Sequence, residues 1–137
     1  MRTLPSHLTR MTAPLNPVGW FQIPVNDMER AMAFYDAVFG YTLERKTMPD
    51  GDMAWFPSSM DAAGCSGCLV KHAMSHPSDK GTLVHFESPS GDLSTELSRV
   101  EKAGGTVLGP KIPIGEYGFY AFVKDTEGNQ IGVHSMR

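Results

Sequence analysis

Apolar and polar positions alternate at the start of the patterned part of the chain, between residues 18 and 25. Phe21, Ile23 and Val25 are apolar, whereas positions 20, 22 and 24 carry tryptophan, glutamine and proline. A period of two residues is typical of a β-strand whose two faces meet different environments. The sequence therefore predicts a strand with one apolar face and one mixed face.

A helical period follows this strand. Asn26 and Asp27 are residue types that cap helix N-termini, and Gly40 is of the type that ends helices. The apolar residues between them, at spacings of three, four and seven, are Met28, Ala31, Met32, Tyr35, Val38 and Phe39. Three more strands are predicted at 41–48, 53–57 and 67–72, with turn-forming residues at 49–52. The first unit is thus β-α-β-β-β.

The same order repeats after residues 73–81, whose composition is that of a linker. A strand is predicted at 82–88, a helix capped by Asp92 and ended by Gly104 and Gly105, and strands at 106–108, 118–124 and 130–135. Turns are expected at 109–116 and 125–129. The two cap residues, Asp27 and Asp92, lie 65 positions apart, so the chain is read as two copies of one unit.

These patterns predict an α+β fold of eight strands and two helices in a single domain, residues 17–137. Its two units span about 17–73 and 81–137. Residues 1–16 have no hydrophobic period and are expected to form an N-terminal arm, in which Met11 is an alternative start.

The strands of both units separate into two faces. The apolar set, expected to lie under the helices, comprises Phe21, Ile23, Val25, Val84, Phe86, Ile131 and Val133. The mixed set comprises Trp20, Gln22, His85, Glu87, Gln130, Gly132 and His134. Polar groups that converge among aromatic side chains are what a small-molecule pocket needs. We therefore expect a shared cavity whose ligand-binding residues are Trp20, Gln22, His85, Glu87, Gln130 and His134.

Composition narrows the class of protein. The 137 residues are 41% hydrophobic and 20% charged, with a formal net charge of −3, which is typical of a globular domain. This charge offers no basic surface for nucleic acid. Neither a span of about 18 apolar residues nor a signal-peptide segment is present, so a cytoplasmic protein without membrane contact is predicted.

Cys65 and Cys68 form a single C-x-x-C motif. One such pair supplies only two of the four ligands of a structural zinc site. Flanking glycines at 64 and 67 indicate a loop entering a strand, so structural thiols are preferred here to a redox or metal-binding pair.

Residues 25–35 (VNDMERAMAFY) with 39–41 (FGY), and residues 125–131 (DTEGNQI), resemble the vicinal oxygen chelate superfamily. That superfamily includes glyoxalase I, extradiol dioxygenases and bleomycin-resistance proteins. The strand 83–86 (LVHF), the glycine pair 104–105 and the strand 118–122 (GFYAF) resemble its glyoxalase-related bacterial branch. The resemblance implies two β-α-β-β-β units that form paired sheets with a shared cavity.

The resemblance also implies a divalent metal held by one histidine, glutamate or glutamine from each of four strands. Two of these positions carry residues without a suitable donor: Trp20 in the first strand and Gly132 in the last. His85 falls at a ligand position of the fifth strand, and His72 is a further candidate. Two imidazoles do not make a tight site, so no cofactor is predicted.

Three hypotheses about function follow, in order of preference. The first is a binding or sequestering protein, as in the bleomycin-resistance branch, that holds a small ligand in an aromatic cavity without a metal. The second is a metal-dependent lyase, isomerase or dioxygenase whose site is completed by His72, His85 and a second chain, with Glu87 as base. The third is a domain that binds a partner through the arm at 1–16.

The candidate residues also have structural interpretations. His85 is alternatively a neutral packing residue, Glu87 a carboxylate at a wet cavity mouth and Trp20 a core aromatic. If Glu87 lies against Trp20, desolvation is expected to raise the pKa of its carboxyl, which suits a general acid or base. His85 and Glu87 are therefore the candidate catalytic residues. We further expect a homodimer whose sheets contribute to each other's cavity.

Overall fold

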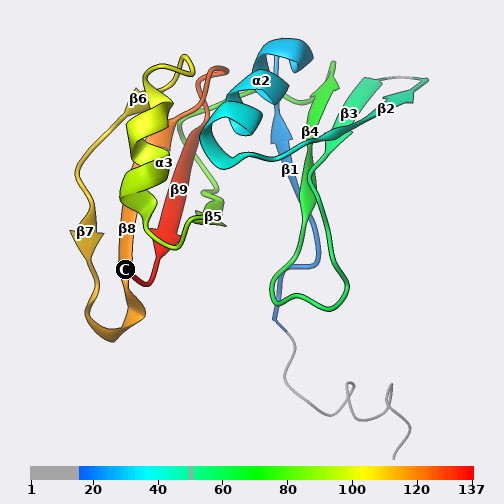
Figure 1. Cartoon of the computed structure of the whole chain (residues 1–137). Helices are drawn as coiled ribbons and strands as arrows, with labels where there is room; N and C mark the ends of the chain where they lie inside the picture. Colours follow the sequence, from blue (N-terminus) through cyan, green and yellow to red (C-terminus); the bar gives the residue numbers. More distant parts are fainter. Residues whose placement is uncertain (1–15, 50) are drawn as a thin grey trace, which may run out of the picture.

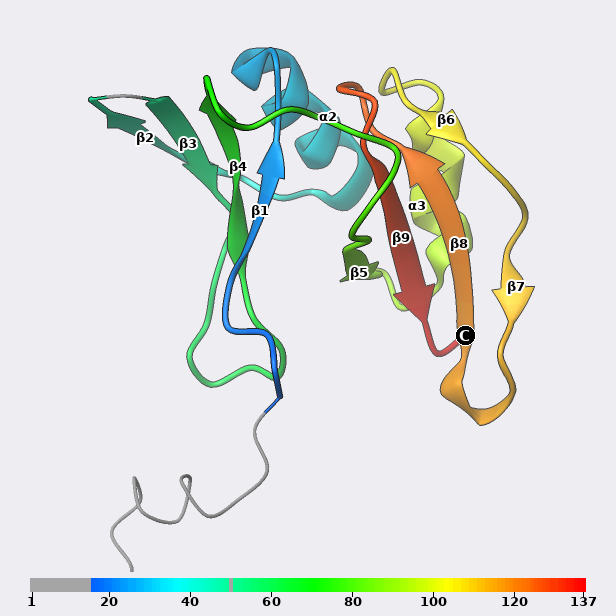
Figure 2. The ribbon, with the colours of Figure 1, turned by 180° about the vertical axis from the view of Figure 1, so that it is seen from behind.

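Two β-sheets stand side by side, and one helix packs on each of them (Figures 1 and 2). The computed structural model describes residues 16–49 and 51–137. The arm expected at 1–16, with the alternative start at Met11, lies outside the described residues except for Asn16.

The two sheets have related topologies. The first contains β1 (Phe21–Pro24), β2 (Glu44–Met48), β3 (Gly51–Trp55) and β4 (Gly67–His72), in the order β1-β4-β3-β2. The second contains β5 (His85–Glu87), β6 (Thr106–Val107), β8 (Phe119–Lys124) and β9 (Gln130–Ser135), in the order β5-β9-β8-β6, while β7 (Ile112–Pro113) pairs with β8. In each sheet the first strand is parallel to the last strand of its unit. The predicted α+β fold of two β-α-β-β-β units is confirmed.

Local capping chemistry sets the ends of both helices. Helix α2 (Met28–Phe39) begins where the Asp27 side chain accepts a hydrogen bond from the Arg30 backbone N–H at 3.0 Å, and Gly40 ends it in the left-handed conformation. Helix α3 (Leu93–Val100) is capped by Asp92. Among the described residues, no helix has the length and apolar character needed to cross a membrane.

The core lies between the helices and the sheets. The predicted inward residues Ile23, Val25, Phe86, Ile131 and Val133 are buried. Phe21 and Val84 are half-buried, because they lie where the two sheets meet. The face assignment made from strand parity is therefore correct for the buried centre and less sharp at the boundary between the units.

The second unit departs from the predicted elements. Residues 109–116, expected as a turn, contain the short strand β7 and the start of a 3-10 helix, η1 (Gly115–Tyr117). The described residues therefore hold nine strands, not eight. Pro113 lacks a backbone N–H, but it is tolerated because β7 pairs only with β8, as an edge strand does. The strand expected at 82–88 is reduced to the three residues of β5.

Strand limits in the first unit also shift. The strand expected at 41–48 begins at Glu44, because Tyr41 stacks on Phe39 with ring centroids 5.5 Å apart. The strand expected at 53–57 spans Gly51–Trp55 instead.

The turn at 125–129 fastens the second unit to helix α2 of the first. Glu127 accepts hydrogen bonds from the backbone N–H groups of Asn26 and Asp27 at 2.8 Å each, and pairs with Arg30 at 2.8 Å. Asp125 accepts one from the Tyr35 hydroxyl at 2.7 Å. Desolvation opposes ionisation of Glu127, but these donors outweigh it and lower the pKa of its carboxyl to about 2.

Candidate functional site

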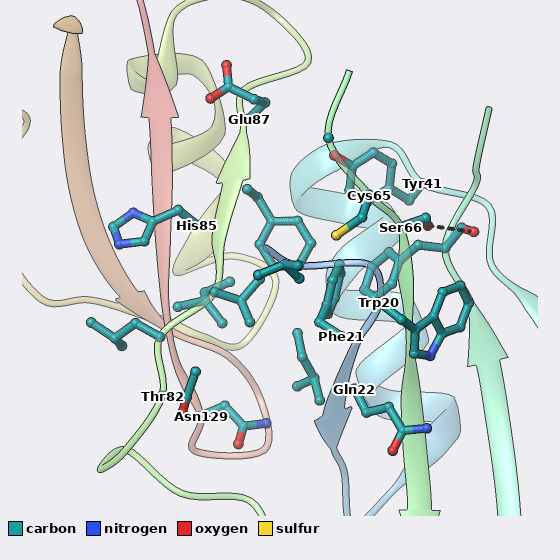
Figure 3. Close-up of a pocket in the computed structure, with 18 of the residues that line it drawn as sticks. Trp20, Phe21, Gln22, Tyr41, Cys65, Ser66, Thr82, His85, Glu87 and Asn129 are labelled. Carbon is teal, nitrogen blue, oxygen red and sulfur yellow. Dashed lines mark hydrogen bonds between the residues drawn. The ribbon is translucent and has the colours of Figure 1, made fainter. Parts of the chain in front are cut away.

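A crevice lies where the edge strands β1 and β5 face each other (Figure 3). Its volume is about 860 Å³, within the range of small-molecule sites. Its lining comprises residues 18, 20–24, 41, 56–57, 63–66, 78, 82–87 and 129–131. We call this the β1–β5 crevice.

Aromatic rings form the centre of the crevice. The rings of Phe21 and Phe56 lie 5.6 Å apart, those of Phe21 and Phe86 lie 5.8 Å apart, and those of Phe56 and Phe86 lie 5.5 Å apart. Tyr41 lies beside them, 5.7 Å from Phe56. Burial, and to a lesser extent the negative charges of nearby glutamates, raise the pKa of the Tyr41 hydroxyl. This phenol is therefore a hydrogen-bond donor at neutral pH.

The first sheet supplies a second aromatic group. Trp20 is 40% exposed and contacts Trp55 edge to face, with ring centroids 5.2 Å apart. The Lys46 ammonium lies 4.7 Å from the centroid of the Trp55 ring. Both tryptophans of the chain thus lie at or next to the crevice, and Trp20 offers part of its ring to a ligand.

The two thiols occupy different environments. Both Cys65 and Cys68 are free; Cys65 is exposed and lines the crevice, whereas Cys68 is buried in β4. Burial raises the pKa of the Cys68 thiol, although hydrogen bonds with Trp20 and Gln22 partly oppose this. A buried thiol of raised pKa is poorly reactive, in keeping with the structural role expected for Cys68.

His85 takes up the space beside the glycine of the last strand. A Cβ atom at Gly132 would lie 2.3 Å from Nδ1 of His85, and the imidazole packs 5.7 Å from the Phe122 ring. Burial lowers the pKa of His85 below its ordinary value of 6.5, and the nearby His134 lowers it further. This shift favours the neutral form of the His85 imidazole.

Glu87 forms an ion pair with His134, its register partner on β9. Oε1 of Glu87 lies 2.5 Å from Nδ1 of His134, and Nε2 donates to the backbone carbonyl of Tyr117 at 2.6 Å. With both ring nitrogens facing acceptors, the imidazolium form is favoured. The Tyr117 carbonyl first, and Glu87 as well, raise the pKa of His134 above 6.5 against the effect of burial.

The expectation that Glu87 lies desolvated against Trp20 is wrong. Its side chain is 75% exposed, since it lies at the end of β5 and points to the solvent-facing side of that strand, where it pairs with His134. In Figure 3, His85 and Glu87 extend from one side of the crevice, whereas Trp20 and Gln22 extend from the other.

Five of the six predicted ligand-binding residues line the crevice: Trp20, Gln22, His85, Glu87 and Gln130. His134 does not line it and reaches it only through Glu87. His72 lines a separate hollow of about 430 Å³ near the start of α2.

Sequence reasoning missed Tyr41, Phe56 and Asn129 as lining residues. Tyr41 and Phe56 belong to predicted strands, and strand parity says nothing about a gap between sheets. Asn129 could have been found from the sequence, because it belongs to the 125–129 motif that carries the family resemblance. Its side chain donates to the Pro24 carbonyl at 2.8 Å and accepts from the Ser78 N–H at 2.9 Å.

The side chains present do not fit a divalent metal. Within the described part of the chain, no group of three or more histidine, cysteine, aspartate or glutamate side chains is placed to hold one. Trp20 and Gly132 occupy two of the positions at which the resemblance implies ligands. His72 and His85, the weak metal candidates, line different hollows.

Comparison with known proteins relates this geometry to a family. The model of the Glyoxalase/Bleomycin resistance protein/Dioxygenase superfamily matches residues 17–133. A glyoxylase-like domain-containing protein of Didymella fabae is 28% identical over 116 residues, which cover 82% of this chain and 88% of that protein.

Solved structures agree with this match. TnmS3, an antibiotic binding protein from Streptomyces sp. CB03234, is 25% identical with a TM-score of 0.62, over 90% of this chain and 98% of that one. Glyoxalase I from Zea mays is 19% identical with a TM-score of 0.67, over 88% of this chain. The match spans only 46% of the maize chain.

Proposed function

Since the chain belongs to the Glyoxalase/Bleomycin resistance protein/Dioxygenase superfamily, we propose that it binds a small molecule in the β1–β5 crevice. In this proposal the ligand is held or sequestered without a resident metal, and no bond is changed. The observation that carries it is an aromatic crevice of about 860 Å³, and among the described residues no three histidine, cysteine, aspartate or glutamate side chains are placed to hold a metal there.

The similarity to TnmS3 supports binding more than catalysis. TnmS3 is an antibiotic binding protein, and the alignment covers 98% of its chain. Maize glyoxalase I, at 19% identity, supports the fold alone.

The alternative, a metal-dependent lyase, isomerase or dioxygenase, is supported by no observation in the described residues. His85 packs beside Gly132 and His72 lines a different hollow, so they share no coordination sphere. About one nickel, zinc or iron ion per purified chain, lost in His85→Ala, would reverse this preference.

A calorimetric titration with naphthylmethanol, a neutral aromatic alcohol, tests the proposal. We expect one site per chain, with Trp20→Ala weakening binding about fivefold through loss of ring contact, roughly 1 kcal/mol. Trp20→Phe should restore part of the affinity. Leu108→Ala, an exposed apolar residue outside the crevice, is the matched control. Equal affinity in wild type and Trp20→Ala would place the ligand elsewhere.

Homodimer formation and a cytoplasmic location remain part of this proposal. Neither is needed for the crevice itself, which one chain supplies.

A further inference from the structure

The lining of the β1–β5 crevice is unbalanced in charge. Of the described residues that line it, Glu87 is the only acidic residue, and none is a lysine or arginine. Burial first, and His134 as well, lower the pKa of His85, the one histidine in the lining. A negatively charged ligand would therefore find no lysine or arginine in the lining, whereas a positively charged one would find Glu87.

Glu87 is accessible for this role. It lies at one end of the crevice in Figure 3, and 75% of its side-chain surface is exposed. Its present partner, His134, does not line the crevice and is held from its other ring nitrogen by the Tyr117 carbonyl at 2.6 Å. The protein thus already pairs an imidazole with this carboxylate, from outside the crevice.

The crevice that Glu87 lines also contains aromatic rings. Phe86, which precedes Glu87 in β5, is buried on the opposite face of the strand, as Phe56 is in the core, so the rings that remain partly exposed are those of Trp20, Phe21 and Tyr41. The charge of Glu87 contributes to the raised pKa of Tyr41, so the phenol lies within electrostatic reach of the carboxylate. Rings of this kind bind apolar groups and also attract cations to their faces.

We propose that Glu87 is a charge-selective anchor, so that the crevice prefers ligands with a protonated amine attached to an aromatic body, and that His134 is its competing internal counter-ion. This inference rests on the proposed function and adds the class of ligand to it. A ligand ammonium would take a place on the Glu87 carboxylate that His134 now shares, while the aromatic body packs against the partly exposed rings of Phe21 and Tyr41.

Three probes of nearly equal shape test the inference: naphthylmethylamine, naphthylmethanol and naphthoate, which are cationic, neutral and anionic near neutral pH. Titration calorimetry measures each affinity. We expect the amine to bind wild type about three- to fivefold more tightly than the alcohol, and naphthoate to bind least. Glu87→Gln should remove the preference for the amine over the alcohol, so that the ratio of the two affinities falls to about one.

His134→Gln supplies the opposite change. It removes the competing cation and keeps hydrogen-bonding capacity, so the amine should bind about threefold more tightly while the alcohol is unaffected. Glu116→Gln, an exposed glutamate outside the crevice, is the matched control and should alter neither ratio. Circular dichroism verifies that each variant is folded.

The outcomes test two hypotheses separately: that Glu87 selects ligands by charge, and that the crevice binds a small molecule. If the alcohol binds and the amine binds no more tightly, or if the amine preference survives in Glu87→Gln, the anchor is refuted while the binding crevice stands. Suppose that Trp20→Ala weakens the binding of all three probes by the same factor, and that only Glu87→Gln changes the ranking of their affinities. The binding crevice and the Glu87 anchor are then both supported. If no probe binds, the proposed function fails and the anchor fails with it.

Discussion

His85 and His134 show how the partners of an imidazole set its charge. They lie on neighbouring strands of one sheet, and the charge of His134 helps to lower the pKa of His85. His85 packs beside Gly132 and Phe122, where burial disfavours the charged form. His134 lies between two acceptors, Glu87 and the Tyr117 carbonyl, which favour it.

This difference predicts two separate imidazole titrations. In proton NMR of the folded protein, His134 should titrate above 6.5 and His85 below it. The same shifts make the stability of the fold depend on pH. His134 contributes stability below the pKa that it has in the unfolded chain, and this contribution is lost as the pH rises through its raised pKa in the folded protein. His85 has the opposite effect: its contribution is present above its unfolded pKa and is lost as the pH falls through its lowered folded pKa. Glu87→Gln should lower the pKa of His134. Coincident titrations near 6.5 would contradict the described hydrogen bonds.

At the scale of elements, the turn at 125–129 acts as a connector between units. Its Glu127 carboxylate is fully buried and receives two backbone N–H groups from the start of α2, together with the Arg30 guanidinium. The next acceptor, Asp125, holds the Tyr35 hydroxyl of the same helix. One short turn therefore positions α2 against the second unit, and with it the β1 side of the crevice.

We expect Glu127→Gln to lower the free energy of unfolding at neutral pH by about 3 kcal/mol. This magnitude follows from a carboxyl pKa of about 2 against an ordinary 4.5. The lowered pKa means that the stabilisation is present above pH 4.5 and is lost as the pH falls toward about 2. Urea denaturation across this range measures it, with the exposed Glu116→Gln as control. A difference that persisted unchanged in acid would argue against the ionised carboxylate as the cause.

The helices were predictable because their signals are local. Asp27, Gly40 and Asp92 act within one helical turn of the backbone they cap, so the pattern of a few residues suffices. The short strand β7 was missed for the opposite reason. Ile112 and Pro113 pair with residues of β8 several positions later, and nothing in their own neighbourhood predicts that pairing.

The candidate site was predictable only in part. Strand parity placed Trp20, Gln22 and His85 on mixed faces, and all three line the crevice. Parity cannot say which side chains of one face meet, so it did not reveal that His134 lies outside the crevice and pairs with Glu87 at the end of the crevice. The crevice lies between the edges of two sheets, and that spacing is set by packing between units.

At the scale of the whole molecule, each sheet has one face without a helix. On the first sheet this face carries the exposed rings of Trp20 and Trp55. On the second, Ile112 pairs in register with Tyr120, which pairs with His134, so these side chains share the face opposite α3.

These faces lead us to predict a homodimer. Two chains that cover each other's helix-free faces outside the crevice would shield the exposed side chains of Trp55 and Ile112, and a stable interface of this kind buries roughly 800 Å² per chain. Light scattering coupled to size exclusion at about 10 µM, a concentration at which micromolar or tighter association is populated, should give twice the mass of one chain. Trp55→Glu places a charge on the face of the first sheet and should shift the mass toward one chain. Met74→Glu, at an exposed position in the connection between the units, should leave it unchanged. A mass of one chain for wild type at this concentration would refute the dimer, and with it the expectation that the two sheets contribute to each other's cavity.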